Sequence, residues 1–193
     1  MEHRLNYSEE VEQPISMHPK KFALWLFIVS VVMIFAGLTS AYIVRQGEGN
    51  WLEFELPQIL WLTSGIIVLS SISMHWAYLS AKKDQLDQLK LALGVTTALG
   101  IAFLVGQWYS WVALVDMDVY FVGNPAGSFL YVLTGLHAIH LISGVIFMII
   151  VLISSFKYKI HSKRLTSLEM CATYWHFLGA LWLYLFMFLL INH

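Results

Sequence analysis

Four histidines stand inside long apolar stretches of the sequence, where imidazole is the side chain best suited to chemistry: His75, His137, His140 and His176. Imidazoles from facing helices hold haem iron in membrane cytochromes, so haem ligation is one interpretation. At about 1.5 Å per residue, His75 and His176 lie within about 12 Å of the same membrane face, which leaves that interpretation open. His137 and His140 argue against it. Residues three apart share a helix face and hydrogen-bond more naturally to neighbours or backbone carbonyls than to one iron from both sides.

A single carboxylate and a single thiol complete the candidate groups in these stretches, Glu169 and Cys171. One cysteine forbids an intramolecular disulfide, a paired-thiolate metal site, an iron–sulfur cluster and a CxxCH haem attachment. Glu169 precedes His176 by seven residues, so both lie on one helix face about 10 Å apart, too far for a direct bond. Either can meet a polar headgroup, a water molecule or a side chain from another helix. A carboxylate in a first turn is also favoured by the helix dipole.

The composition indicates an integral membrane protein. Of 193 residues, 59% are hydrophobic and 12% are charged, whereas soluble domains have roughly 45–50% and about 25%. The net charge of −1 shows no basic excess, which argues against nucleic acid as a partner. The apolar stretches hold no Asp, Lys or Arg, and ionisable groups at mid-membrane usually serve transport or proton relay. An ion channel, a proton pump or a transporter is therefore disfavoured.

Five stretches are long enough to cross a bilayer as helices. A hydrocarbon core of about 30 Å needs about 20 residues, and continuously apolar runs differ from the alternating pattern of barrel strands. Glycines within them, among them Gly100 and Gly144, predict close helix packing. The predicted fold is an all-α integral membrane bundle of five transmembrane helices, at Phe22–Val44, Pro57–Ala81, Leu91–Val115, Ser128–Ile153 and Leu168–Ile191.

The placement of lysine and arginine predicts the orientation of this bundle. Ten of the 11 basic residues fall in the N-terminal tail, the second-to-third loop and the fourth-to-fifth loop, whereas Arg45 alone falls on the other side. By the positive-inside rule, the N-terminus is cytoplasmic and the C-terminus periplasmic. Residues 1–21 then form a cytoplasmic tail, and residues 22–193 form the membrane domain. Pro14, Pro19 and the mixed charge of the tail indicate a tether rather than a domain.

Two late motifs resemble the signature of a known family. Gly127–Phe129 and Thr134–Gly144 read GSF and TGLHAIHLISG, and Glu169 leads to the YWHF block Tyr174–Phe177 and then Trp182. Both patterns resemble subunit III of haem–copper oxidases, which includes cytochrome c oxidase subunit III. Further matches to that family are Gln107 and an opening Leu24–Phe27 with Ser30 and Met33. The resemblance runs from about residue 20 to the end and implies the short five-helix bacterial form, which lacks the two N-terminal helices of the seven-helix version.

Three positions depart from the family pattern. Val31 stands where the family commonly has a Glu, Ser110 where a Glu often follows the Gln, and Gly179 where Asp usually follows the YWHF block. At position 31, valine therefore replaces the intramembrane carboxylate of the family. Any role built on that carboxylate cannot be carried over to this chain.

The resemblance implies a non-catalytic subunit of a respiratory terminal oxidase in the bacterial inner (plasma) membrane, fed by cytochrome c or quinol through other subunits. Such a subunit carries no haem or copper, which belong to its partners. It packs against subunit I, with subunit II and a small subunit IV as further partners, and a larger respiratory supercomplex is left open. It binds phospholipid in a cleft between helix groups and supports oxygen access, proton uptake and stability during oxygen reduction. The residues then expected to contact lipid or other subunits are Gln107, His137, His140, Glu169, Trp175 and His176.

Two alternatives remain from the sequence. One is the related accessory subunit of a nitric oxide reductase, which shares the five-helix form. The other is a haem-binding membrane cytochrome that anchors a dehydrogenase, which requires histidines that face one another across helices.

Overall fold

The structure is a computed structural model that describes residues 19–52, 54–156 and 165–192. It contains five long helices, α1 (Pro19–Gly47), α2 (Ile59–Lys82), α3 (Leu86–Asp116), α4 (Pro125–Phe156) and α5 (Thr166–Asn192). All five are long and apolar enough to span a membrane, and no strand occurs among the described residues. The predicted all-α fold of five spans is confirmed. The helices extend beyond the predicted spans, except that α2 begins two residues after Pro57.

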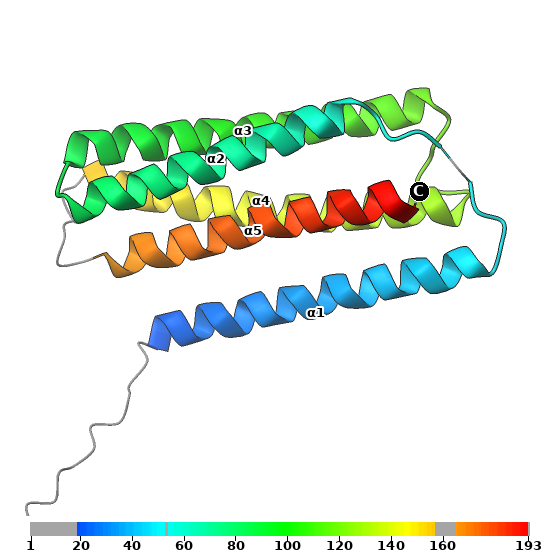
Figure 1. Cartoon of the computed structure of the whole chain (residues 1–193), viewed down its shortest axis with the longest axis horizontal. Coiled ribbons are helices and arrows are strands. Elements are labelled where there is room, and N and C mark those ends of the chain that lie inside the picture. The colour runs from blue at the N-terminus through cyan, green and yellow to red at the C-terminus, as the bar shows by residue number, and fades with distance from the viewer. Residues whose placement is uncertain (1–18, 53, 157–164, 193) are drawn as a thin grey trace, which may run out of the picture.

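Four of the helices form an antiparallel bundle, and the first lies outside it. Around the bundle, α2 contacts α3, α3 contacts α4, α4 contacts α5, and α5 closes the ring on α2. Helix α1 packs on α4 and α5 and shares no backbone contact with α2 along their described lengths. Figure 1 shows this arrangement, with α1 set apart below the other four. One side of α5 is therefore left uncovered between α1 and α2.

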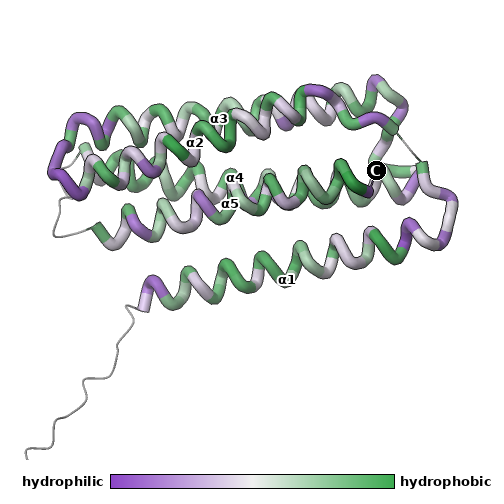
Figure 2. The backbone as a smooth tube through the Cα atoms, viewed as in Figure 1, coloured by the Kyte–Doolittle hydropathy of each residue, from purple (hydrophilic) through white to green (hydrophobic). Residues whose placement is uncertain are grey.

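The distribution of apolar residues suits a bilayer. The largest fully buried side chains include Trp175, Trp182 and Phe103, which fill the bundle interior. The outer faces are also apolar, as in Met33 of α1 with 69% exposure, because lipid tails solvate them. Hydrophilic residues gather at the helix ends (Figure 2). Hydropathy alone therefore defines the spans, while the contacts inside the bundle depend on residue size and hydrogen bonding.

The N-terminus of α4 is fixed by Asn124. Its Oδ1 accepts hydrogen bonds from the backbone N–H of Ala126 (2.9 Å) and of Leu52 (3.3 Å), and its Nδ2 donates to the carbonyl of Asn50 (3.2 Å). Asn124 is thus an N-cap residue, and Pro125 occupies the first helical position, where its missing N–H is harmless. The same side chain ties the loop between α1 and α2 to the start of α4.

The charges of the described residues are divided between the two ends of the bundle. Five lysines lie at the end where α1 begins, namely Lys20, Lys21, Lys82, Lys83 and Lys90, and Arg45 lies at the opposite end. The other five basic residues, Arg4, Lys157, Lys159, Lys163 and Arg164, lie outside the described residues. The orientation predicted from the positive-inside rule remains a proposal.

Candidate functional site

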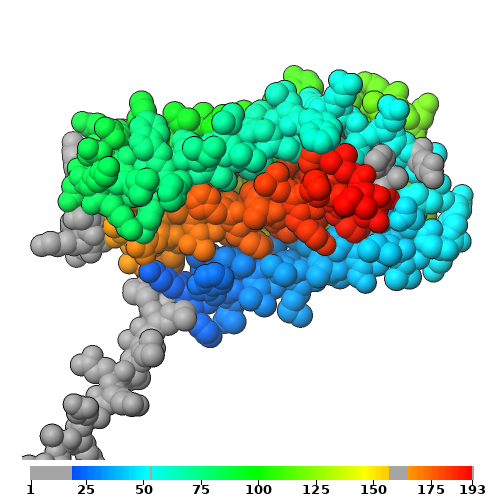
Figure 3. Space-filling view, viewed as in Figure 1, coloured from blue at the N-terminus to red at the C-terminus, as the bar shows by residue number. Residues whose placement is uncertain are grey.

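A groove runs along α5 between α1 and α2, and two predicted site residues lie in it. It consists of two adjoining cavities of about 500 Å³ and 460 Å³ that share His75 and His176. Figure 3 shows the surface of α5 exposed between α2 and α1. We call this the α5 groove, lined by Lys21, Leu24, Trp25, Ile67, Val68, Ser71, Ile72, His75, Tyr78, Glu169, Met170, Ala172, Thr173, His176, Gly179, Ala180 and Leu183.

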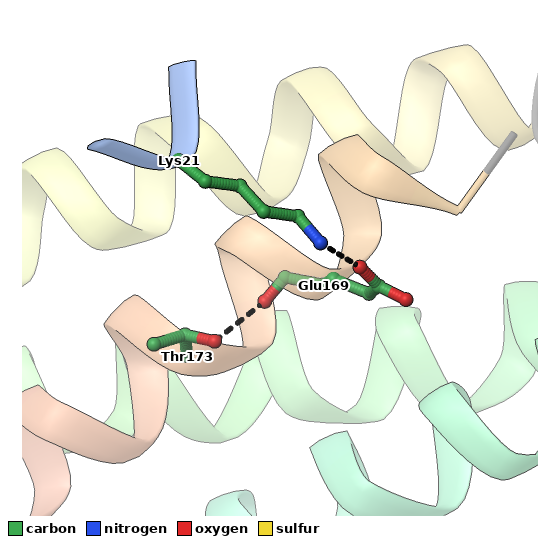
Figure 4. Close-up of polar contacts among 3 residues, drawn as sticks. All are labelled: Lys21, Glu169 and Thr173. Atoms are coloured by element: carbon green, nitrogen blue, oxygen red, sulfur yellow. Dashed lines mark hydrogen bonds and ion pairs between the residues drawn. The ribbon is translucent and has the colours of Figure 1, made fainter. Parts of the chain in front are cut away.

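An ion pair joins α1 to α5 at the lysine-rich end of the groove. The Nζ of Lys21 lies 2.6 Å from Oε2 of Glu169, and the two side chains are 40% and 31% exposed. The Thr173 hydroxyl donates to the backbone carbonyl of Glu169 at 2.9 Å, one turn further along α5 (Figure 4). Of the partners considered for Glu169 from the sequence, the side chain from another helix is confirmed. Glu169 also lies in the first turn of α5, where the helix dipole favours a carboxylate.

Two imidazoles meet across the groove. The ring centroids of His75 in α2 and His176 in α5 are 6.4 Å apart, with a 57° angle between the planes. No hydrogen bond links either ring to another described residue, so their nitrogens are available to a ligand in the groove. Groups of three or more His, Cys, Asp or Glu placed to hold a metal ion are absent from the described part of the chain. The pair supplies hydrogen-bond donors and acceptors at the boundary between the two cavities, where the groove changes from ionic to apolar lining.

The two histidines of α4 have different environments although they are only three residues apart. The ring of His137 is fully buried in the bundle, 5.1 Å from the Trp182 ring and 5.9 Å from the Phe103 ring. Neither of its nitrogens has a hydrogen-bond partner among the described residues. His140 instead points toward α1 and donates Nδ1–H to the carbonyl of Leu136 at 2.8 Å. The predicted bond to a backbone carbonyl is confirmed for His140, and His137 shows none.

His140 is also enclosed by aromatic rings of α1. The Phe27 and Phe35 rings lie 6.2 Å and 5.9 Å from it. These two phenylalanines are four residues before and after Val31, which is itself only 1% exposed. The residue at position 31 therefore belongs to the part of α1 that covers His140. A valine there buries an apolar side chain where the family pattern places a carboxylate.

Trp175 holds the four bundle helices together from α5. Its indole N–H donates to the Ser70 hydroxyl of α2 at 3.1 Å. The ring lies against Gly100 of α3 and Gly144 of α4, where an added Cβ would come within 2.6 Å and 3.4 Å of ring carbons. Two helical turns further along α5, the indole N–H of Trp182 donates to the Ser64 hydroxyl at 3.0 Å. These bonds are internal to the chain, so Trp175 joins α5 to its neighbouring helices.

Gln107 and the remaining two departures from the family pattern also lie on packed surfaces. Gln107 is 2% exposed in α3, and its Oε1 has no partner among the described residues. Ser110 is buried and donates to the carbonyl of Gly106 at 3.0 Å. Gly179 lies in the α5 groove against Ser71, whose Oγ would be 3.0 Å from an added Cβ. The predicted contact residues thus divide into Glu169 and His176 in the groove, and Gln107, His137, His140 and Trp175 inside helix contacts.

Sequence reasoning missed three participants in these contacts. By sequence, Lys21 is one of the basic residues of the N-terminal tail, and Ser64 and Ser70 are two of several serines in the second apolar stretch. Trp175 and Trp182 are seven residues apart on α5 and share a helix face, whereas the two serines are six apart on antiparallel α2, about 120° from each other around its axis. The spacing of the serines therefore does not identify them as partners of the two tryptophans, and only the packing of α5 on α2 does.

Comparison with known proteins places these features in a family. A family model described as cytochrome c oxidase subunit III matches residues 9–192. Cytochrome c oxidase subunit 3 of Corynebacterium diphtheriae is 29% identical over 169 residues, which cover 83% of this chain and 82% of that protein. The protein of the same name from Thermostichus vulcanus is 29% identical over 90% of this chain and 89% of its own length. That of Synechocystis is 32% identical, over 88% and 75%.

Proposed function

The chain belongs to the cytochrome c oxidase subunit III family, and on that premise we propose that it is a non-catalytic subunit of a respiratory haem–copper terminal oxidase. The family match over residues 9–192 carries this proposal. Haem and copper then reside in partner subunits. The chain contributes a membrane-embedded bundle that stabilises those partners.

The interior of the bundle supports a packing role. Its polar contacts in the described residues are neutral, as in the Trp175–Ser70 and Trp182–Ser64 hydrogen bonds. The ion pair between Lys21 and Glu169 lies at the periphery, with both side chains about one third exposed or more. Charged groups that conduct ions or relay protons are usually held inside a bundle or along a water-filled cavity. Electron and proton transfer are accordingly assigned to the partner subunits.

The partners follow from the family. The main partner proposed is subunit I, with subunit II and a small subunit IV as further neighbours, in a bacterial plasma membrane with the lysine-rich end of the bundle in the cytoplasm. The apolar outer surfaces provide the area for such contacts. Exposed residues on α1 and α2, such as Met33 and Leu62, are large and apolar, and in a bilayer such a surface contacts either lipid tails or another transmembrane helix.

Lipid binding and oxygen access form the second part of the proposal. The α5 groove has ionic groups at one end and apolar walls at the other, which is the polarity of a phospholipid. Apolar acyl chains beside the subunit would offer oxygen a permeable route toward the catalytic subunit. The same lipid would help keep proton uptake and the catalytic subunit stable through turnover.

Co-purification tests the assignment. The chain with an affinity tag should retain a large partner of about twelve spans that carries haem and copper, and the isolated complex should reduce oxygen. Haem bound to this chain alone would overturn the proposal. Consumption of nitric oxide without oxygen reduction would instead assign the chain to a nitric oxide reductase.

The proposed role in oxygen access and in stability during turnover is tested by a separate measurement. Oxidase prepared with and without this subunit should differ in apparent oxygen affinity and in the rate of inactivation during turnover. Equal values for both preparations would remove oxygen access and turnover stability from the proposed role.

A further inference from the structure

The loop between α3 and α4 is held in one shape by the first residues of α4. It lies at the end of the bundle where α1 ends (Figure 1). The Ser128 hydroxyl donates to the carbonyl of Phe121 at 2.6 Å. At Gly127, an added Cβ would lie 2.5 Å from the carbonyl oxygen of Tyr120, so the loop backbone passes where only a glycine leaves room. Gly127 and Ser128 belong to the GSF motif of the sequence, which therefore shapes this loop.

The inner side of the loop is anchored as well. Val119 is buried; its N–H donates to the carbonyl of Leu114 at 3.0 Å, and its carbonyl accepts the Tyr131 hydroxyl at 3.0 Å. Gly123 has a φ of 125°, a conformation that a residue with a Cβ rarely adopts, where the chain turns into α4. A loop fixed at this many points loses little conformational entropy when it binds a partner.

The outer side of the loop presents large apolar side chains. Tyr120, Phe121 and Val122 are consecutive in the sequence and are 51%, 55% and 80% exposed. Contiguous exposed apolar side chains mark a site of contact with a membrane or with another protein. Aromatic side chains on a rigid surface are typical of the residues that carry most of the energy of a protein interface.

Depth along the helices separates the loop from the membrane. Trp108 and Tyr109 of α3 are 64% and 59% exposed, as expected for aromatic residues at headgroup level. One turn further along α3, Trp111 donates its indole N–H to Thr134 at 3.0 Å, which places Thr134 of α4 near the same level. From Thr134 to its first residue, Pro125, α4 continues for nine residues, or about 13 Å. The headgroup region is only about 5–7 Å thick on each side, so the loop lies on the aqueous side of it.

The charges around the loop are acidic. Asp116 ends α3, Asp118 follows it in the loop, and both are exposed. The Tyr120 hydroxyl donates to Oδ1 of Asp118 at 3.1 Å, which holds one carboxylate beside the aromatic side chains. Carboxylates next to aromatic rings suit an arginine or a lysine, which pairs with the carboxylate and lies over a ring face. The same carboxylates are repelled by anionic lipid headgroups, so a basic protein segment fits this surface better than a membrane does.

A cavity of about 760 Å³ adjoins the loop and continues this surface. It lies between the end of α1 and the start of α4, and its lining includes Gly123, Asn124 and Ser128 on one side and Arg45 and Glu48 on the other. Arg45 and Glu48 form an ion pair with each other at 3.0 Å. The cavity gives room for a segment that extends past the exposed loop residues and hydrogen-bonds to the polar groups of its lining.

We propose that the α3–α4 loop is a docking surface for a basic extramembrane segment of another subunit of the oxidase. An arginine or lysine of that segment lies against Phe121 and pairs with Asp116 or Asp118. This inference rests on the proposed function, because it presupposes the complex. It adds a contact outside the bilayer, distinct from the apolar surfaces of α1 and α2.

Site-specific photocrosslinking in the intact complex identifies the occupant. p-Benzoylphenylalanine takes the place of Phe121, the native membranes are irradiated, and the crosslinked peptide of the purified complex is identified by mass spectrometry. The peptide should come from another subunit of the oxidase, contain arginine or lysine, and lie outside the transmembrane helices of that subunit. The same probe in place of Ile191, which is 75% exposed in the last turn of α5 at the same end of the bundle, is the matched control and should not capture this peptide.

Rebinding of the full chain to oxidase depleted of it measures the contribution of the loop. Phe121→Ser should weaken binding about ten-fold, which is about 1.4 kcal/mol, whereas Ile191→Ser should not. Asp116→Asn combined with Asp118→Asn should weaken binding at low salt and remove most of its salt dependence, because exposed charge pairs are screened.

Two variants test the shape of the loop without changing its exposed side chains. Gly127→Ala displaces the backbone of Tyr120 and should weaken binding as Phe121→Ser does. If Gly127→Ala fails to fold, Ser128→Ala removes only the hydrogen bond to the Phe121 carbonyl and should weaken binding several-fold.

The possible outcomes are distinct. Crosslinks from position 121 to lipid alone, or to a peptide without a basic residue, overturn the inference. So does wild-type binding by both Phe121→Ser and the doubly substituted Asp116 and Asp118 chain. Haem and copper content of the same sample reports on the proposed function. A complex that holds both and gives no such crosslink overturns the inference alone, whereas a complex that holds neither overturns the proposed function.

Discussion

Substitution of Gly100 by alanine should destabilise the bundle more than the same substitution at Gly144, although both glycines contact Trp175. At Gly100, an added Cβ would lie 2.6 Å from Cη2 of the indole and 3.2 Å from Cγ2 of Val145. The indole is rigid, and its N–H is held by a hydrogen bond to Ser70. At Gly144, the nearest atom is Cδ1 of Leu178 at 2.8 Å, the end of a flexible side chain that can rotate away.

The magnitude follows from three terms. Overpacking of a well-filled core costs about 1–3 kcal/mol, and displacement of the indole also weakens the Trp175–Ser70 hydrogen bond, a type of contact that averages about 0.6 kcal/mol in membranes. Alanine recovers up to about 1 kcal/mol of helix propensity relative to glycine. The net loss expected for Gly100→Ala is about 1–2 kcal/mol. Gly144→Ala should be close to neutral.

The assay is reversible unfolding in mixed micelles, with far-UV circular dichroism followed against the mole fraction of dodecyl sulfate. The decisive comparison is a double-mutant cycle with Trp175→Phe, because phenylalanine lacks the part of the indole that reaches Gly100. On that background, Gly100→Ala should lose most of its effect. Gly94→Ala, where an added Cβ meets nothing within 4 Å, is the control for propensity. Equal losses at Gly100 and Gly144, or strict additivity with Trp175→Phe, would refute the reasoning.

Three more predictions concern polar side chains. His137→Leu should leave the unfolding free energy unchanged or raise it by up to about 1–3 kcal/mol in the same assay, because the buried ring has no partner to lose; a clear decrease would contradict this. Glu169→Gln should lower that free energy by at most about 1 kcal/mol, since its ion pair with Lys21 is partly exposed, and should not alter the haem absorption spectrum of the parent oxidase; a lost haem band would contradict it. Asn124→Ala should cost about 0.5–2 kcal/mol and speed limited proteolysis of the loop at residues 48–58, which Asn124 holds to α4; unchanged cleavage would show that the loop is held elsewhere.

The sequence predicts the elements of this fold better than their contacts, for a physical reason. A membrane span must satisfy its own backbone and present apolar side chains to lipid, so hydropathy locates each helix without knowledge of its neighbours. The pairing of helices depends on contacts between side chains that are far apart in the sequence, and the sequence of one chain does not show which of them meet. Glu169 was recognisable as a carboxylate that needs a partner, yet nothing in the spacing identified Lys21, 148 residues away, as that partner.

The histidines show the same limit. Depth along the helices placed His75 and His176 near one membrane face, and the structure brings their rings to 6.4 Å. For the other pair, the shared helix face predicts hydrogen bonds to neighbours or backbone carbonyls for both His137 and His140. One helix face is broad enough to meet two neighbours, so His137 points into the bundle and His140 toward α1. Helical periodicity gives the direction of a side chain, and only the arrangement of helices gives its environment.

Two departures from the family pattern have related physical effects. At position 31, a carboxylate would have to be buried between the phenylalanines that enclose His140, whereas Val31 fills that space with an apolar side chain. At position 179, an Asp would place a charge against Ser71 in the floor of the α5 groove, whereas Gly179 leaves that floor open and apolar. A buried carboxylate is kept only where pairing or hydrogen bonding offsets its desolvation. Both departures remove that requirement, so neither position of this chain supplies a titrating group.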